Sequence, residues 1–168
     1  MDEARIGQQG ALTRVWAKTG SRPTAVRQTE YEWVYLWAAI EPASGASIAM
    51  ITPTVSTELM NVFLHGLSES LASDDEHAVL VLDNAGWHVA KALRVPSNVT
   101  LLHLPPYSPE LNPAERLWGW LRRHRLSNRI LADYDELLST TNQAWLTLDE
   151  PTMKSLCACP WIERAVHA

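Results

Sequence analysis

Two acidic residues, Asp83 and Glu115, occupy positions that could have a chemical role. The first follows an apolar run, and the second follows a proline-rich segment that restricts the backbone. Asp83 directly follows the apolar run "AVLVL", which is typical of a strand buried on both faces. Glu115 follows "LPPYSPELNP", a ten-residue segment with four prolines. An acid at the end of a buried strand needs a cation, a hydrogen bond or a cap to compensate it. Several carboxylates gathered in such a place can hold divalent metal ions.

Both acids also have simpler interpretations. Asp83 could close the turn that follows it through its own side chain, as Asx residues do. Glu115 could complete a capping box in which Asn112 is the N-cap and Pro113 takes the first helical position. Taken alone, helix capping is the commoner use of such a pattern.

The elements around the two acids favour a shared site. The stretch "NVTLLHLP" predicts a second buried strand after that of Asp83, and ligands gather at the carboxyl ends of neighbouring strands. The prolines then restrict the backbone that leads to Glu115. Asn84 lies beside Asp83. Asp2 and Glu3 precede the segment "ARIG", which could begin a first strand, and they could supply a third acid.

The helix of Glu115 also carries basic residues. Its segment "RLWGWLRRHRLSNR" contains five arginines on a chain whose net charge is −5. They are either a solvated helix face or a wall that binds phosphates. The five are Arg116, Arg122, Arg123, Arg125 and Arg129.

The hydrophobic pattern predicts an α/β fold with a mixed sheet flanked by helices. Strands are expected at 14–17, 32–40 and 46–52 as an antiparallel meander, with the two buried strands at 77–83 and 98–105. Helices are expected at 55–71, 89–94, 113–125 and 133–146, a solvated loop at 69–76, and an irregular tail after Leu146.

The length of 168 residues fits a single domain, large enough to bury a core. The sequence has no apolar run near the ~20 residues that a membrane helix needs and no signal pattern, so we expect a cytoplasmic protein. Cys157 and Cys159 form a lone CxC pair, which we interpret as reduced and structural. The acidic charge argues against indiscriminate nucleic-acid binding.

Three blocks of the chain resemble a known family. In order, "DEARIGQQG…RVWAKTGSRP", "VLVLDNAGWH" and "LPPYSPELNPAERLW" are similar to blocks of the mariner-superfamily transposases of bacterial insertion sequences. These are DDE endonucleases with a ribonuclease-H-like fold. The resemblance runs from Asp2 to the region after Asn128. It implies that Asp2, Asp83 and Glu115 are the catalytic acids, and 31 residues separate the last two.

The resemblance also implies a mechanism. The three acids would hold two Mg²⁺ ions, which Mn²⁺ can replace, for phosphodiester cleavage and strand transfer. Asn84, His88 and Asn112 occupy motif positions that would support the site. His88 would contact DNA, support Asp83 or serve only the structure.

The implied partner is double-stranded DNA, at the element ends and at the target, in a bacterial cytoplasm with association to the nucleoid. A homodimer is a further expected partner. Family members carry an N-terminal helix-turn-helix DNA-binding domain, which we expect to be absent before Asp2 in this chain. We therefore expect a first strand truncated at its start and a DNA-binding half that is separately encoded or fused by frameshifting.

The sequence leaves two other functions open. The chain could be a catalytically impaired remnant that binds DNA or a full-length transposase. It could also be a ribonuclease-H-type nuclease that acts on RNA–DNA hybrids, which would share the metal chemistry.

Overall fold

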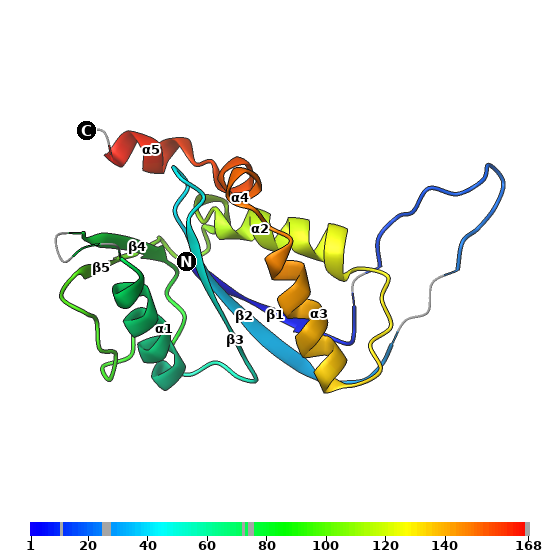
Figure 1. Cartoon of the computed structure of the whole chain (residues 1–168), viewed down its shortest axis with the longest axis horizontal. Coiled ribbons are helices and arrows are strands. Elements are labelled where there is room, and N and C mark those ends of the chain that lie inside the picture. The colour runs from blue at the N-terminus through cyan, green and yellow to red at the C-terminus, as the bar shows by residue number, and fades with distance from the viewer. Residues whose placement is uncertain (11, 25–27, 72, 74–75, 167–168) are drawn as a thin grey trace.

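A computed structural model describes the chain over residues 1–10, 12–24, 28–71, 73 and 76–166. Its centre is an antiparallel sheet in the order β1 (Asp2–Gly7), β2 (Trp33–Ile40) and β3 (Ser47–Thr52). A parallel pair, β4 (Ala78–Leu82) and β5 (Val99–His103), lies next to it (Figure 1). The predicted meander over 32–52 and the strands within 77–83 and 98–105 are confirmed, but the second of these is not buried: only Val99 of β5 is enclosed, and Leu102 is 45% exposed.

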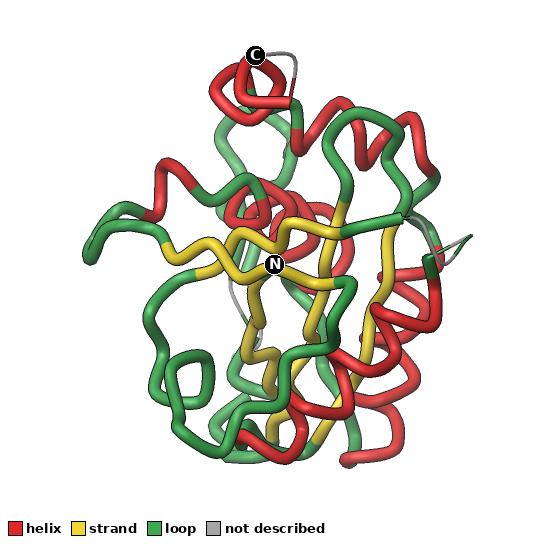
Figure 2. The backbone as a smooth tube through the Cα atoms, turned by 90° about the vertical axis from the view of Figure 1, so that its left-hand side faces the viewer, coloured by secondary structure: helices red, strands yellow, loops and turns green. Residues whose placement is uncertain are grey.

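The two sheets adjoin at the start of the chain. The Met1 amino group donates a 2.7 Å hydrogen bond to the Val81 carbonyl of β4. Figure 2 shows the strands close together in the middle of the molecule, with helices above them and along the right-hand side. The first residues of β1 therefore lie beside the carboxyl end of β4, where the predicted site begins.

The helices begin at side-chain caps that the sequence provides. Ser56 caps α1, Asp133 caps α3 and Asp149 caps α4, each by accepting a backbone N–H bond, which satisfies donors that a helix start leaves open. The helices are α1 (Thr57–Ser70), α2 (Ala114–Leu121), α3 (Tyr134–Leu146), α4 (Glu150–Cys157) and α5 (Pro160–Val166). A π-helical turn at Arg122–Leu126 continues α2, so the predicted helices at 55–71, 113–125 and 133–146 are confirmed.

Side-chain alternation along β2 divides the interior into two cores. Val34, Leu36 and Ala38 pack on one side with α2, α3 and α4. Trp37 and Ala39 pack on the other side with α1 and β4. Because successive strand residues point to opposite faces, one central strand serves both layers. The result is an α/β/α arrangement, and the predicted mixed α/β fold is confirmed.

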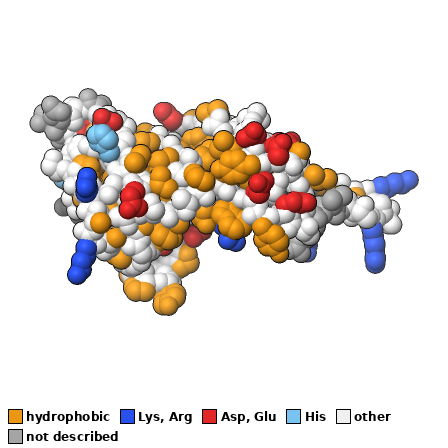
Figure 3. Space-filling view, turned by 90° about the horizontal axis from the view of Figure 1, so that it is seen from below, with side chains coloured by type: hydrophobic (Ala, Val, Ile, Leu, Met, Phe, Trp, Pro, Cys, Tyr) orange, Lys and Arg blue, Asp and Glu red, His pale blue; other side chains and the backbone are white. Residues whose placement is uncertain are grey.

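The predicted strand at 14–17 is wrong. Between β1 and β2 the chain makes a long projection, and its described residues 12–24 form no strand (Figure 1). Trp16 is fully exposed and Val15 is 55% exposed. A β-rich run without a neighbouring strand gains neither ladder bonds nor packing. Figure 3 shows basic side chains at the outer end of this projection.

The predicted helix at 89–94 is also wrong. The segment forms turns, and the side chain of Asn61 in α1 binds it on both sides. Asn61 accepts a 2.7 Å bond from the Arg94 N–H and donates a 3.3 Å bond to the Ala92 carbonyl. These tertiary bonds satisfy backbone groups that a helix would otherwise pair.

The prediction of an irregular tail after Leu146 is wrong, because α4 and α5 lie in this part of the chain. The Asp149 cap and a proline in the first turn of α4 start that helix, and Met153 and Cys157 bury one side of it. Cys157 and Cys159 are free and buried, in agreement with the structural interpretation. The predicted loop at 69–76 overlaps the end of α1 and lies partly outside the described residues.

In the described part of the chain, no helix combines the length and the apolar character needed to cross a membrane.

Candidate active site

A pocket of about 440 Å³ opens where β4 and β5 end, and it brings the three predicted acids together. Asp2 comes from the first position of β1, Asp83 follows β4, and Glu115 lies in the first turn of α2. The rest of the lining consists of Asn84, Ala85, Asn112 and the segment 104–109. Among the described residues, no three acidic, histidine or cysteine side chains converge closely enough to hold an ion as they stand.

Asp2 is the most enclosed of the three acids. Its Oδ2 accepts a 2.9 Å bond from the indole of Trp118 in α2, and its Oδ1 accepts one from the Glu3 N–H. Burial raises the pKa of Asp2 from 3.8 to about 6, against the effect of the Trp118 bond and with the charges of Glu3 and Glu115 adding to it. The carboxylate form is therefore destabilised unless a cation is present.

Asp83 is more open, with a side chain that is 57% exposed. Its Oδ1 accepts bonds of 2.9 Å from the Ala85 N–H and 2.8 Å from His88 Nδ1. The Asx turn expected from the sequence is thus present, and the same carboxylate lines the pocket. Asn84 donates a 2.7 Å bond to the Leu104 carbonyl, which ties this turn to the end of β5.

The proline segment places the start of α2. Tyr107 has a φ of 58°, which lies in the left-handed region that residues other than glycine rarely adopt. Asn112 Oδ1 accepts the Ala114 N–H bond as an N-cap should, while its Nδ2 donates to the Met1 carbonyl. The Asn112 N–H binds the Pro109 carbonyl, so Glu115 is not needed to close a capping box. Its side chain is exposed and lines the pocket.

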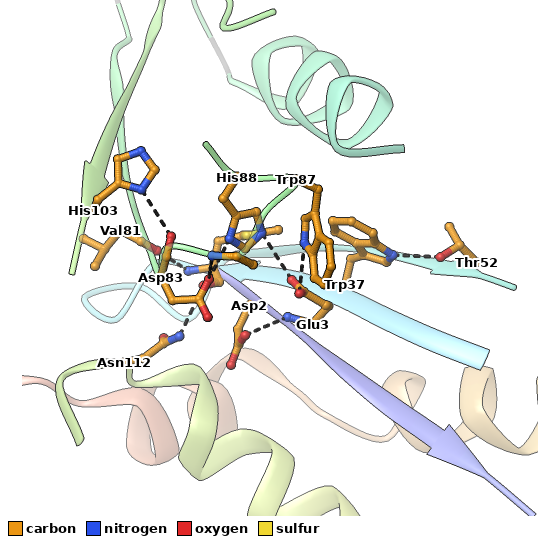
Figure 4. Close-up of polar contacts among 12 residues, drawn as sticks. Asp2, Glu3, Trp37, Thr52, Val81, Asp83, Trp87, His88, His103 and Asn112 are labelled. Atoms are coloured by element: carbon orange, nitrogen blue, oxygen red, sulfur yellow. Dashed lines mark hydrogen bonds and ion pairs between the residues drawn. The ribbon is translucent and has the colours of Figure 1, made fainter. Parts of the chain in front are cut away.

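His88 lies behind the pocket rather than in it. Its side chain is completely buried, with Nδ1 on Asp83 and Nε2 3.3 Å from Glu3 Oε2. Burial works to lower the pKa of His88, but interactions with Glu3 and then Asp83 outweigh it and raise the pKa above 6.5. Figure 4 shows the imidazole between the two carboxylates. A contact of this ring with DNA is inconsistent with its burial.

The five arginines do not share one environment. Arg116 donates a 2.8 Å bond to the Ala158 carbonyl. Arg125 binds Thr147 and lies over the Trp120 ring, 5.2 Å from its centroid. Arg122 lines a second pocket of about 440 Å³, together with Arg5 of β1. Arg123 and Arg129 are exposed.

A family model for the DDE superfamily endonucleases matches residues 1–138. This chain belongs to the DDE superfamily endonucleases. An uncharacterized protein of Sinorhizobium fredii, y4pE/y4sA, is 42% identical to this DDE family member over 135 residues, covering 79% of this chain and 99% of that protein.

The fold of this DDE family member is also that of solved transposases. The Mos1 mariner paired-end complex with Mn has a TM-score of 0.69 at 17% identity, and the paired-end complex with the left transposon end has 0.68 at 19%. The Mos1 strand transfer complex has 0.66 at 18% identity. Each comparison covers 92–93% of this chain and 48–50% of the Mos1 chain. The chain thus spans about half the length of these neighbours, and the expected ribonuclease-H-like fold is confirmed.

Sequence reasoning missed the contacts that Glu3, Trp87 and Trp118 make around the site. The sequence offered Glu3, together with Asp2, as a candidate for the third acid, whereas the side chain of Glu3 faces His88. Trp87 donates a 3.0 Å bond to Glu3 Oε1 and Trp118 binds Asp2. The tryptophan count gave no signal for this, because buried bulk accounts for most tryptophans. Partners more than 80 positions apart become visible only in the fold.

Proposed function

We propose that this chain is the catalytic domain of a transposase that cuts DNA at the ends of an insertion sequence and joins the freed ends to target DNA. The observation that carries the proposal is the pocket that Asp2, Asp83 and Glu115 share, each supplied by a different element. Membership of the DDE superfamily endonucleases supports the same reaction class.

The lining of the pocket fits divalent cations, with Mg²⁺ as the proposed cofactor and Mn²⁺ as a substitute. Carboxylate and amide oxygens are the ligands that these hard ions prefer. The raised pKa of Asp2 shows that negative charge is unfavourable there without a counter-charge. Bound ions would activate water and stabilise the leaving 3′ oxygen of a phosphodiester. Asp2, Asp83 and Glu115 would hold them.

The protein's own residues position these ligands. Trp118 and the Glu3 N–H fix both oxygens of Asp2. Asn112 joins the start of α2 to the start of β1, which sets Glu115 relative to Asp2. Such preorganised positioning carries most of the catalysis in phosphoryl transfer, because little covalent work falls to side chains.

The proposed partner is double-stranded DNA, both at the element ends and at the target. Arg122, Arg123 and Arg129 are exposed and available to phosphates, whereas Arg116 and Arg125 also bind within the protein. The solved neighbours include a Mos1 complex with the left transposon end. A DNA-binding half that reads the ends, a second copy of the chain, and action on nucleoid DNA in a bacterial cytoplasm complete the proposal.

The test is metal-dependent nicking of supercoiled plasmid DNA by the intact chain. We expect nicking in Mg²⁺ or Mn²⁺ and none in EDTA, and the Asp83→Asn variant should lose at least about 100-fold in rate because a ligand is removed. Glu110→Gln is the matched control, since Glu110 is exposed and does not line the pocket. Wild-type nicking by Asp83→Asn would refute the assignment.

Two further outcomes of this assay would overturn the proposal. A chain that binds plasmid DNA but never nicks it would favour the impaired remnant instead. Preferential cleavage of an RNA–DNA hybrid over duplex DNA would favour a ribonuclease-H-type nuclease.

A further inference from the structure

A buried polar chain runs from Glu3 through His88 to Asp83. The His88 side chain is fully enclosed and that of Glu3 is 9% exposed. The contacts are 3.3 Å from Glu3 Oε2 to His88 Nε2 and 2.8 Å from His88 Nδ1 to Asp83 Oδ1 (Figure 4). The chain thus leads from the interior to the open edge of the site.

Burying the Glu3 carboxylate and the His88 imidazole costs free energy of folding, so stability alone does not account for this pair. Removing a carboxylate and an imidazole from water carries a penalty, and apolar residues of similar volume often stabilise such a place as well or better. Glu3 Oε1 accepts the Trp87 indole bond. In the described structure, Glu3 Oε2 and His88 Nε2 make no hydrogen bond of good geometry, so each has the other as its polar neighbour.

Two adjacent residues of β1 contribute to these contacts: Asp2 lines the pocket, and Glu3 contacts His88. Asp2 faces α2, where it binds Trp118, and Glu3 faces the turn after β4, where it meets Trp87 and His88. Neighbouring residues of a strand point to opposite faces. One strand therefore supplies one site acid directly and reaches the second through a histidine.

We propose that Glu3 is a positioning residue that acts through His88 to fix the carboxylate of Asp83 for metal binding. Asp83 is 57% exposed, so without a partner its side chain would be free to rotate. Both hydrogen bonds that the Asp83 carboxylate makes in the described structure, with His88 Nδ1 and the Ala85 N–H, end on Oδ1. Oδ2 is left for a cation in the pocket. Partners that orient a ligand in this way typically change metal affinity 10- to 100-fold.

The inference rests on the proposed metal site, and its test measures binding as well as activity. Mn²⁺ affinity of the intact chain is measured by electron paramagnetic resonance, alongside thermal melting and plasmid nicking. We expect Glu3→Gln to weaken Mn²⁺ binding about 10-fold or more, with a melting temperature close to wild type. Its nicking should recover at high Mn²⁺ concentration, whereas that of Asp83→Asn should not. Glu110→Gln again serves as the control.

A double-mutant cycle tests whether Glu3 acts through His88. In a His88→Gln background, Glu3→Gln should weaken Mn²⁺ binding by less than 2-fold, because the connection to Asp83 is already broken. Equal, additive effects in both backgrounds would overturn the proposal. So would wild-type affinity in Glu3→Gln.

Two outcomes keep the proposals distinguishable. If wild type binds Mn²⁺ and nicks DNA but Glu3→Gln matches it, only the positioning role fails; if wild type binds no Mn²⁺, the metal site itself fails. Should Glu3→Gln not fold, Trp87→Phe replaces it, because it removes one bond to Glu3 and keeps an aromatic ring. Unchanged affinity in a folded Trp87→Phe would then count against the proposal.

Discussion

Replacing Asp2 by asparagine should stabilise the metal-free protein at neutral pH while removing its response to metal. The pKa of Asp2 rises from 3.8 to about 6 in the folded chain. The folded state therefore holds this proton more tightly than the unfolded state. Stability is lost as pH rises from about 4 to about 6 and stays lost above that range.

The magnitude follows from the size of the shift. A difference of about 2 pKa units corresponds to roughly 3 kcal/mol of lost stability at pH 7.5. Asparagine avoids this loss because it carries no charge. Its amide nitrogen replaces one of the two oxygens that accept bonds from Trp118 and the Glu3 N–H, which costs about 1 kcal/mol. Subtracting this cost from the gain leaves Asp2→Asn about 2 kcal/mol more stable to unfolding than wild type at pH 7.5.

The assay is urea unfolding followed by tryptophan fluorescence, since Trp37 and Trp118 are buried. Wild type and Asp2→Asn are compared without metal at pH 4.0 and 7.5, and with Mn²⁺ at pH 7.5. The stability gap should be near zero or reversed at pH 4.0 and favour the variant at pH 7.5. Mn²⁺ should raise the stability of wild type by about 2.7 kcal/mol at 100 times its Kd, and that of the variant far less.

Two results would refute this reasoning. A variant that is less stable than wild type at both pH values would show that the Asp2 carboxylate is not strained by burial and repulsion. Equal stabilisation of both proteins by Mn²⁺ would show that Asp2 is not a ligand. The exposed Glu110→Gln control should stay within about 0.5 kcal/mol of wild type throughout.

Two further predictions concern the exposed arginines that follow α2 and the fold. The intact chain should bind DNA without sequence preference, and the double variant Arg122→Ala, Arg123→Ala should lower the salt dependence of log Kobs by about one unit per lost phosphate contact; an unchanged slope in fluorescence anisotropy would place the DNA elsewhere. Gly45→Ala should cost about 2–5 kcal/mol in urea unfolding, because Gly45 has a φ of 86° and a Cβ there would lie 2.2 Å from the Glu150 carbonyl oxygen. Gly119→Ala, in open space on α2, should be neutral or stabilising, and equal losses in both variants would contradict the steric argument.

The long, strongly patterned elements could be predicted from the sequence. β2 and β4 are apolar runs, and α1 repeats buried residues at helical spacing, so local pattern and tertiary packing agree there. The short segments failed where distant contacts decide the structure. Residues 89–94 are bound by Asn61 instead of forming a helix, and 14–17 has no strand beside it.

The residues of the candidate site likewise fall into those that the sequence could predict and those that it could not. Asp83 and Glu115 could be found because each follows a recognisable local pattern, a buried strand or a proline segment before a helix. Asp2 needed the family resemblance, since two acids near the start of a chain carry no distinctive pattern. Glu3 and Trp87 could not be found, because their roles depend on a contact across 84 positions. Spacing in the sequence gives no measure of such a contact.

The proline-rich segment 104–112 does more for the structure than cap the helix that follows it. It ends at Asn112, which is buried and binds in two directions, to the start of α2 and to the Met1 carbonyl before β1. At its other end Leu104 accepts the Asn84 bond from the turn of Asp83. The stiff connection therefore links all three acids through two asparagine amides. Because a rigid link transmits position where a flexible one would not, the distance between Asp83 and Glu115 is set by the backbone of 104–112. Tyr107, in the middle of this segment, has a φ of 58°, a conformation that residues other than glycine rarely adopt.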